Sequence, residues 1–166
     1  MQIYLDNAST TPLSENVKSR LVKILDQYGN PSSLHSAGEK PRRIITEARQ
    51  SVAGFIHADA EDICFTPSGS ASNTLAVRGL TSEDPRKDPY EVFYSPTSHK
   101  SMLKACEACN RHIPLEVNSE GKLDLIRLEA SLAQHPSRKP LVCVEAANSE
   151  IGTINDIAGI GGIVHG

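Results

Sequence analysis

The sequence lacks three features that would assign it to a large class of proteins. It has no apolar run long enough to span a membrane, and its first residues, MQIYLDNAS, show no basic segment followed by a long apolar one. Its formal net charge is only −3, which gives no long-range attraction to nucleic acid or to an anionic membrane. With 166 residues, of which 39% are apolar, the chain is long enough to bury one core. We therefore expect a cytoplasmic globular protein without nucleic-acid or membrane partners.

The cysteine patterns of metal and redox sites are also incomplete. Cys106 and Cys109 form a single CxxC, but no second CxxC or pair of histidines completes a zinc site, and no βαβ redox context precedes it. Their spacing also places both residues with Met102 on one helix face, which favours core packing over chemistry. Cys64 and Cys143 lie in the apolar runs ICF and LVCV and are predicted to be buried strand thiols. We expect no metal and a reducing compartment.

Short apolar runs alternate with helical patterns along the chain. Strands are predicted around Ile63–Phe65, in EVFYS, in IPLEV and in LVCVEA, and helices over 14–28, from about Pro41 to Ile56, through Leu75 and Val77, over His99–Cys109 and over Asp124–Ala133. Gly29 is expected to close the first helix, and Pro41 to lie near the first turn of the second. Because the strands are apolar on both faces, the sequence predicts an α/β fold with a mostly parallel sheet flanked by helices.

The last residues have an unusual composition. INDIAGIGGIVHG places Ile154, Ile157, Ile160 and Val164 on one helical face, although glycines within such a helix each cost about 1 kcal/mol relative to alanine. A sheet that ended here would have an unpaired edge and an uncovered apolar face. We therefore expect the sequence to be an incomplete part of a larger α/β domain.

The stretch FTPSGSAS, residues 65–72, ends a predicted strand with small polar residues and begins a helix at once. One interpretation is an N-cap and turn without a ligand, since serine and glycine favour both. The other is an anion site, because a helix N-terminus presents unpaired amides and a favourable dipole, and small residues allow close approach. Taken by itself, the stretch favours the N-cap interpretation.

Five segments follow one another in a specific order. They are YLDNASTTP (4–12), YGNPSSLHSAG (28–38), the FTPSGSAS turn, PTSHKSML (96–103) and ANSEIGTINDI (147–157). Together they resemble the N-terminal half of the NifS-like cysteine desulfurases, which belong to the class V aminotransferase family and depend on pyridoxal 5′-phosphate. The resemblance spans essentially the whole chain. It implies an incomplete large domain of the aspartate aminotransferase-like fold.

The resemblance implies four cofactor-binding residues. Gly69 and Ser70 would hold the phosphate of pyridoxal 5′-phosphate at the start of a helix. His99 would stack on the cofactor ring and transfer protons, which makes it the candidate catalytic residue. Asn148 would donate a hydrogen bond to the phenolic oxygen of the cofactor. From the residues alone, His99 also fits a solvent-exposed histidine at a helix start, and Asn148 a residue that turns the chain after a strand.

The first residues are assigned to a different part of the fold. In the family, the segment that matches residues 1–13 is associated with the small domain and the substrate end of the site. Ala8 and Thr10 are therefore candidates for the substrate pocket. Residues 14–166 are expected to be the N-terminal part of the cofactor-binding large domain.

The resemblance also indicates which groups are missing. In the family, the lysine that binds the cofactor covalently, the acid that faces its ring nitrogen, the arginine for the substrate carboxylate and the nucleophilic cysteine all lie beyond the matched segment. Lys100 follows a histidine, as the family lysine does, but it precedes ANSEIG, whereas the family lysine comes after it. Cys106 and Cys109 likewise precede the expected place of the nucleophile. We expect these residues alone not to turn over cysteine.

The implied parent activity is the conversion of L-cysteine to L-alanine and an enzyme persulfide. A cytoplasmic homodimer of the full-length enzyme would pass this sulfur to an acceptor protein for iron–sulfur cluster or thio-cofactor assembly. Two alternatives stay open. Another class V enzyme, such as a selenocysteine lyase or an aminotransferase, would share this half of the sequence. A truncated, non-catalytic module that pairs with itself or with a partner would bury the surface that a complete enzyme covers.

Overall fold

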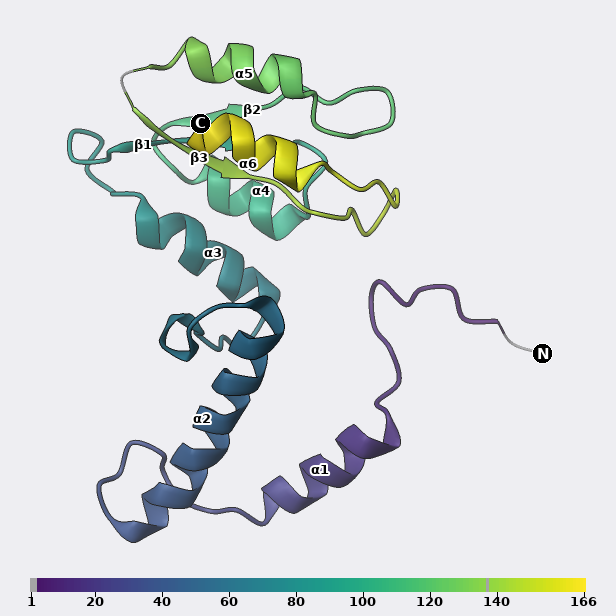
Figure 1. Cartoon of the computed structure of the whole chain (residues 1–166), viewed down its shortest axis with the longest axis vertical. Helices are drawn as coiled ribbons and strands as arrows, with labels where there is room; N and C mark the ends of the chain where they lie inside the picture. The colour runs from purple at the N-terminus through teal and green to yellow at the C-terminus, as the bar shows by residue number, and fades with distance from the viewer. Residues whose placement is uncertain (1–2, 137) are drawn as a thin grey trace. The chain divides into compact units, whose positions relative to one another are not determined.

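The computed structural model describes residues 3–136 and 138–166, and the chain divides into two compact units (Figure 1). The first unit ends at Phe65, and the second unit spans Thr66–Gly166. This division does not coincide with the boundary predicted after residue 13. The association of residues 1–13 with a small domain therefore stays a prediction.

Two helices form most of the first unit. The first, α1, is Glu15–Leu25, and it begins at the N-cap Ser14, whose hydroxyl accepts a hydrogen bond from a backbone amide. The second, α2, is Ser36–Ile56, and the short 3-10 helix η1, Ala60–Asp62, follows it. The two predicted helices are confirmed. No residue of α1, which is described throughout, is buried, so its apolar face is uncovered within this unit.

Two details of the first unit differ from the predictions. The helix α1 ends at Leu25 with Asp26 as its C-cap, so Gly29 lies beyond the helix end and does not close it. The φ angle of Gly29 is 138°, and a Cβ there would lie 2.1 Å from the carbonyl oxygen of Ala37, so only glycine fits. Helix α2 begins at Ser36, earlier than the predicted start near Pro41, so Pro41 is inside the helix. In a helix, the carbonyl of Ala37 would accept from the amide of residue 41, but Pro41 has no N–H. The Ala37 carbonyl, which Gly29 approaches closely, therefore lacks this donor.

The strand predicted around Ile63–Phe65 is wrong. Ile63 has an extended backbone, but within residues 3–136 and 138–166 no strand pairs with this segment. Cys64 is exposed, so the prediction that it is a buried strand thiol is also wrong. A strand requires a hydrogen-bonding neighbour, which an apolar run does not supply by itself.

The second unit is built on a parallel sheet of three strands in its described residues. They are β1 (Tyr90–Tyr94), β2 (His112–Pro114) and β3 (Lys139–Cys143), in the spatial order β2-β1-β3. The central strand β1 pairs in parallel with both neighbours, and helices lie between the strands along the chain. This arrangement confirms the predicted α/β fold with a parallel sheet. The strand β2 is shorter than the predicted strand IPLEV.

Four helices belong to the described part of this unit, and each begins at a polar N-cap. They are α3 (Gly69–Leu80), α4 (Lys100–Glu107), α5 (Leu125–Ala133) and α6 (Ile157–His165). Their N-caps, in the same order, are Ser68, His99, Asp124 and Asp156, and each side chain accepts a hydrogen bond from an amide of the first turn. Helix α6 begins later than the predicted apolar face, so Ile154 lies before the helix and is exposed.

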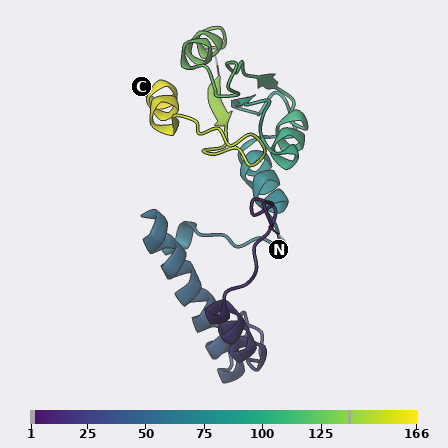
Figure 2. The same cartoon turned by 90° about the vertical axis from the view of Figure 1, so that its right-hand side faces the viewer.

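The sheet separates two hydrophobic clusters. On one side, Val92 of β1 packs in a cluster with Val77 of α3 and Cys106 of α4. On the other side, Phe93 of β1 packs in a cluster with Ile160 of α6 and with side chains of α5. Successive residues of a strand point to opposite faces, and Figure 2 shows α4 on one side of the strands and α5 and α6 on the other. The sheet is therefore covered by helices on both faces.

The CxxC belongs to the first of these clusters. Cys106 is fully buried and Cys109 is 9% exposed, and both share the cluster with Cys143 of β3. This burial confirms the core-packing interpretation. The interaction with the neighbouring Cys143 thiol, followed by burial, raises the pKa of Cys106 well above its ordinary value. Among the residues that the structure describes, no group of three or more side chains has the composition of a metal site.

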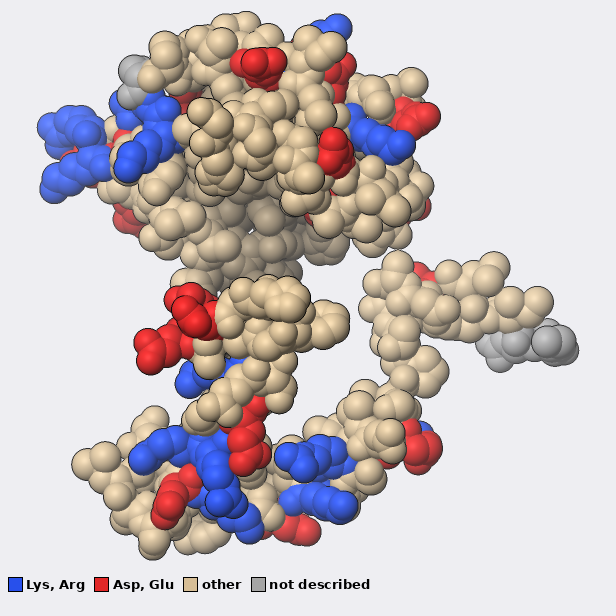
Figure 3. All heavy atoms as spheres, in the orientation of Figure 1, with Lys and Arg blue, Asp and Glu red and all other residues tan. Residues whose placement is uncertain are grey.

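Charged side chains of both signs lie in separate groups on the face drawn in Figure 3. On the first unit, Lys and Arg gather over α1 and α2, and the groove between these helices is lined by Arg20, Lys23, Lys40 and Arg43. On the second unit, basic and acidic groups are scattered between larger areas of other residues. Over the described ranges, no helix combines the length and the apolar character needed to cross a membrane.

Candidate functional site

Two of the predicted site residues lie in loops at one edge of the sheet. The strands β1 and β3 are parallel neighbours, so their carboxyl ends lie at the same edge, where α/β proteins commonly bind ligands. The loop after β1 carries His99, and the loop after β3 carries Asn148. The helix α3, which begins with Gly69 and Ser70, packs against α4. The fold thus brings three separate sequence motifs to one region of the second unit.

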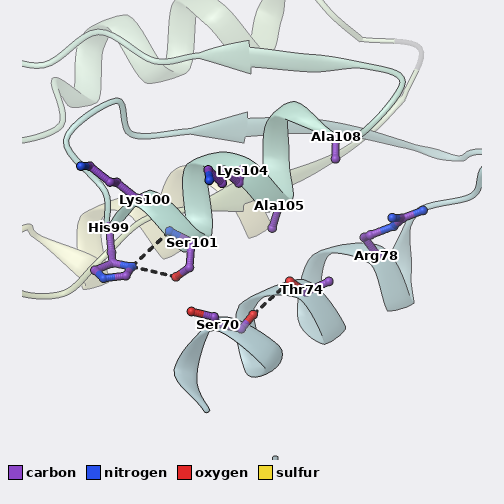
Figure 4. Close-up of a pocket in the computed structure, with 9 residues that line it drawn as sticks. All are labelled: Ser70, Thr74, Arg78, His99, Lys100, Ser101, Lys104, Ala105 and Ala108. Carbon is purple, nitrogen blue, oxygen red and sulfur yellow. Dashed lines mark hydrogen bonds between the residues drawn. The ribbon is translucent and has the colours of Figure 1, made fainter. Parts of the chain in front are cut away.

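A pocket of about 440 Å³ contains three of the predicted residues. It is lined by Gly69 and Ser70 at the start of α3, by His99 at the start of α4, and by Glu145 from the loop after β3. Asn148 does not line this pocket, although the residues on either side of it do. A second pocket, also of about 440 Å³, runs between α3 and α4 and shares Ser70, His99 and Ser101 with the first (Figure 4).

The start of α3 offers unpaired hydrogen-bond donors. Ser68 caps the helix, because its hydroxyl accepts from the amide of Ala71 at 3.2 Å and its carbonyl accepts from the amide of Ser72 at 3.0 Å. In the part of the chain that the structure describes, the amides of Gly69 and Ser70 have no hydrogen-bond partner. A Cβ at Gly69 would meet no atom within 4 Å, so the space beside it is open. Two amides, a hydroxyl and the positive end of a helix dipole suit an anion.

His99 is both a pocket residue and the N-cap of α4. Its Nδ1 accepts a hydrogen bond from the amide of Ser101 at 3.1 Å and lies 2.7 Å from Ser101 Oγ (Figure 4). Asn73 of α3 donates from Nδ2 to the same hydroxyl at 2.9 Å. The backbone amide of His99 donates to Glu145 Oε1 at 2.7 Å. The position of the imidazole is therefore set by α3, by α4 and by the loop after β3.

The side chain of Asn148 is only 8% exposed and is fully hydrogen-bonded. Its Oδ1 accepts from the amides of Glu150 at 2.9 Å and Ile151 at 3.0 Å. Its Nδ2 donates to the carbonyl oxygen of Thr97 at 2.6 Å and to Glu145 Oε2 at 3.3 Å. These bonds match the interpretation of Asn148 as a residue that turns the chain after a strand. A hydrogen bond from Nδ2 to any further oxygen requires the release of one of these two acceptors.

No sequence motif pointed to Glu145, which links the two loops of the site. One of its carboxylate oxygens accepts from the His99 amide and the other from the Asn148 side chain. Its position could have indicated a role, because Glu145 follows the end of a predicted parallel strand, where α/β proteins commonly bind ligands. Asn73 and Ser101 were also overlooked, although Ser101 stands two residues after a histidine at a predicted helix start.

The candidates for the substrate pocket lie in the first unit. Residues 7–9 form a turn, in which the amides of Ser9 and Thr10 donate to the carbonyl of Asp6 at 3.2 and 3.4 Å. Both Ala8 and Thr10 are exposed. Their role in a substrate pocket stays a prediction.

Residues 3–166 match the class V aminotransferase family. The cysteine desulfurase of Cereibacter sphaeroides is 34% identical over 173 residues, which cover 99% of this chain and 43% of that protein. The cysteine desulfurase of Nostoc sp. is 35% identical over 164 residues, which cover 96% of this chain and 40% of that protein. The chain thus spans about two fifths of the length of the curated relatives that it matches.

Solved structures give the same relationship. A NifS-like protein from Rickettsia africae has a TM-score of 0.87 and 33% identity, over 99% of this chain and 45% of that chain. The structure of SspA in complex with cysteine has a TM-score of 0.87 and 27% identity, over 98% of this chain and 47% of that chain. These matches confirm the predicted fold and the resemblance to NifS-like proteins. The chain belongs to the class V aminotransferase family.

Proposed function

We propose that this chain is the N-terminal, coenzyme-binding part of a pyridoxal 5′-phosphate-dependent cysteine desulfurase. The full-length protein would convert L-cysteine to L-alanine and an enzyme persulfide. It would act as a cytoplasmic homodimer and pass the sulfur to an acceptor protein for iron–sulfur cluster or thio-cofactor assembly. The names of the relatives in Cereibacter sphaeroides and Nostoc sp. support the activity, and four free cysteines support a reducing compartment.

The observation that carries the proposal is the start of α3. Gly69 and Ser70 combine a hydroxyl with two amides that have no partner among the described residues, at the positive end of a helix and beside open space. These donors fit the doubly charged phosphate of the coenzyme. When bound, pyridoxal 5′-phosphate supplies an electron sink for chemistry at the Cα atom of an amino acid.

The remaining pocket residues would orient the coenzyme ring. His99 lines the pocket and would stack on this ring, and Nε2 is its nitrogen without a bond to Ser101. Glu145 fixes the backbone at His99 through its 2.7 Å hydrogen bond. Asn148 would reach the phenolic oxygen of the coenzyme by giving up its longer bond, the 3.3 Å contact with Glu145, while it keeps the 2.6 Å bond to Thr97.

The proposal assigns the nucleophilic thiolate and the coenzyme-binding lysine to residues outside this sequence. Three of the four cysteines are buried, and the raised pKa of Cys106 disfavours its thiolate. The exposed Cys64 belongs to the other unit. We expect this chain, incubated with pyridoxal 5′-phosphate and L-cysteine, to release no sulfide above a protein-free control. Clear turnover would contradict this assignment.

Calorimetric titration with pyridoxine 5′-phosphate tests the phosphate site. This ligand has no aldehyde, so it cannot form imines with surface lysines, and pyridoxine is the matched ligand without phosphate. We expect saturable binding of the phosphate ester and binding of pyridoxine that is at least about 10-fold weaker, because the amides of Gly69 and Ser70 contact only the phosphate. Equal affinity for the two ligands, or no binding of either, would refute the proposal.

A charge variant locates the bound phosphate. Ser70→Glu places a carboxylate in the first turn of α3, where the helix dipole accepts it but a phosphate is repelled, and it should weaken binding of the phosphate ester by about 10-fold or more. Ser51→Glu adds the same charge to the exposed surface of α2 and should leave the affinity unchanged. If both variants bind like the parent chain, the phosphate lies elsewhere.

A further inference from the structure

We propose that Ser101 and Asn73 are positioning residues that select one tautomer of the neutral His99 imidazole, the one with its proton on Nε2. The hydrogen bonds that carry this inference belong to the chain itself. The consequence for the coenzyme ring rests on the proposed function.

The backbone of α4 makes Nδ1 of His99 an acceptor. The amide nitrogen of Ser101 lies 3.1 Å from this atom, and a backbone N–H can only donate. Nδ1 must therefore present its lone pair. In a neutral imidazole only one nitrogen carries hydrogen, so the proton is on Nε2.

The Ser101 hydroxyl is a second donor to the same nitrogen. Because Nδ1 of His99 presents a lone pair, the hydroxyl 2.7 Å away donates to it, and the Nδ2 group of Asn73 donates to a lone pair of Ser101 Oγ at 2.9 Å. Asn73 belongs to α3 and Ser101 to α4, so the chain of hydrogen bonds joins the two helices of the pocket drawn in Figure 4. Both side chains are partly buried, which strengthens these bonds relative to bonds in water.

In this tautomer Nδ1 of His99 is held by Ser101, and Nε2–H is a hydrogen-bond donor. In the proposed function, the ring would orient the coenzyme and Nε2–H would be its donor.

Nitrogen NMR of the whole chain labelled with ¹⁵N-histidine tests the assignment. Long-range ¹H–¹⁵N spectra at neutral pH distinguish protonated from unprotonated ring nitrogens, and His99→Gln identifies the His99 signals among the six histidines. We expect an unprotonated Nδ1 and a protonated Nε2. A protonated Nδ1 in the parent chain would overturn the proposal.

Variants of the two positioning residues complete the test. Ser101→Ala removes the hydroxyl, and Asn73→Asp replaces its donor with an acceptor that competes for the hydroxyl hydrogen. Each should lower the ratio of the Nε2–H to the Nδ1–H tautomer on the order of 5-fold, the equivalent of one hydrogen bond. Ser101→Thr should restore the ratio, and Ser51→Ala on α2 should leave it unchanged.

An unchanged ratio in both Ser101→Ala and Asn73→Asp would also overturn the proposal. The tautomer is measured without coenzyme, so the two hypotheses fail separately. If His99 has the expected tautomer but pyridoxine 5′-phosphate does not bind, the proposed function is wrong and the role of the positioning residues stands.

Discussion

Replacement of Asn148 by alanine tests whether this side chain stabilises the fold before any ligand binds. The side chain accepts from the amides of Glu150 and Ile151 and donates to Thr97 and Glu145. Alanine leaves all four of these groups without their partner. Because Asn148 is only 8% exposed, water replaces the lost bonds poorly.

The size of the effect follows from these four bonds. A hydrogen bond contributes about 0.5–1.5 kcal/mol net, and one to a charged group about 1.5–3 kcal/mol. Glu150 and Ile151 are exposed, so water can bind their amides in the variant, and each of these two hydrogen bonds contributes only about 0.5 kcal/mol. The bonds to Thr97 and Glu145 are internal, but the latter is long, at 3.3 Å. Together they give a loss of about 3 kcal/mol in the free energy of unfolding of the second unit.

Urea unfolding followed by far-ultraviolet circular dichroism measures this loss in a chain without tryptophan. Asn118→Ala is the matched control, since its Oδ1 accepts from the amides of Glu120 at 2.9 Å and Lys122 at 3.0 Å in an exposed loop. It should cost about 1 kcal/mol. A loss for Asn148→Ala no greater than that for Asn118→Ala would refute the reasoning, because it would mean that the internal bonds contribute nothing.

Three further changes test other parts of the structure. Gly29→Ala should destabilise the first unit by about 2 kcal/mol or more, because Gly29 has a positive φ and a Cβ there would meet the Ala37 carbonyl. Limited proteolysis should then be faster than in the control Gly54→Ala, whose added methyl group meets open space in α2. Equal rates of proteolysis in the two variants would contradict the described conformation at Gly29. Iodoacetamide should modify the exposed Cys64 first, and Cys106 should stay unmodified at pH 9, because its raised pKa keeps the thiol protonated until higher pH. Mass spectrometry that shows equal rates would contradict its burial. Glu145→Gln keeps an oxygen that accepts from the His99 amide but places an amide group against the Asn148 donor. It should lower the free energy of unfolding by about 1 kcal/mol, which corresponds to roughly 4–8 °C in Tm measured by calorimetry. An unchanged Tm would contradict the proposed link between the two loops.

Periodicity predicted the elements whose partners lie within the chain. The run EVFYS is apolar on both faces, and its residues Val92 and Phe93 pack into clusters on opposite sides of the sheet. The helix predicted over Asp124–Ala133 begins one residue later, with Asp124 as its N-cap. In both cases a local pattern and its tertiary contacts agree, which makes the pattern informative.

Periodicity did not predict which apolar faces are covered. The run around Ile63–Phe65 reads as a buried strand, yet Phe65 is 51% exposed. The apolar face of α1 includes Leu25, which is 82% exposed. A pattern identifies the face that would be buried, but burial depends on a neighbouring element, and the pattern carries no information on that neighbour.

The candidate site was predictable only in part, for a similar reason. The order of motifs predicted that Gly69, Ser70 and His99 would meet, and they line one pocket. The bond between His99 and Glu145 joins residues 46 positions apart, so it depends on how two loops align at the sheet edge. Local sequence does not encode such an alignment.

The amide resonances of Gly69 and Ser70 give the most direct test of the central claim, which is that the start of α3 binds a phosphate. They are followed in the ¹⁵N-labelled chain during titration with pyridoxine 5′-phosphate and, separately, with pyridoxine. The account predicts that both resonances shift with the phosphate ester and stay in place with pyridoxine, because these two amides have no other partner among the described residues. If the phosphate ester shifts resonances elsewhere and leaves these two unmoved, the account is wrong.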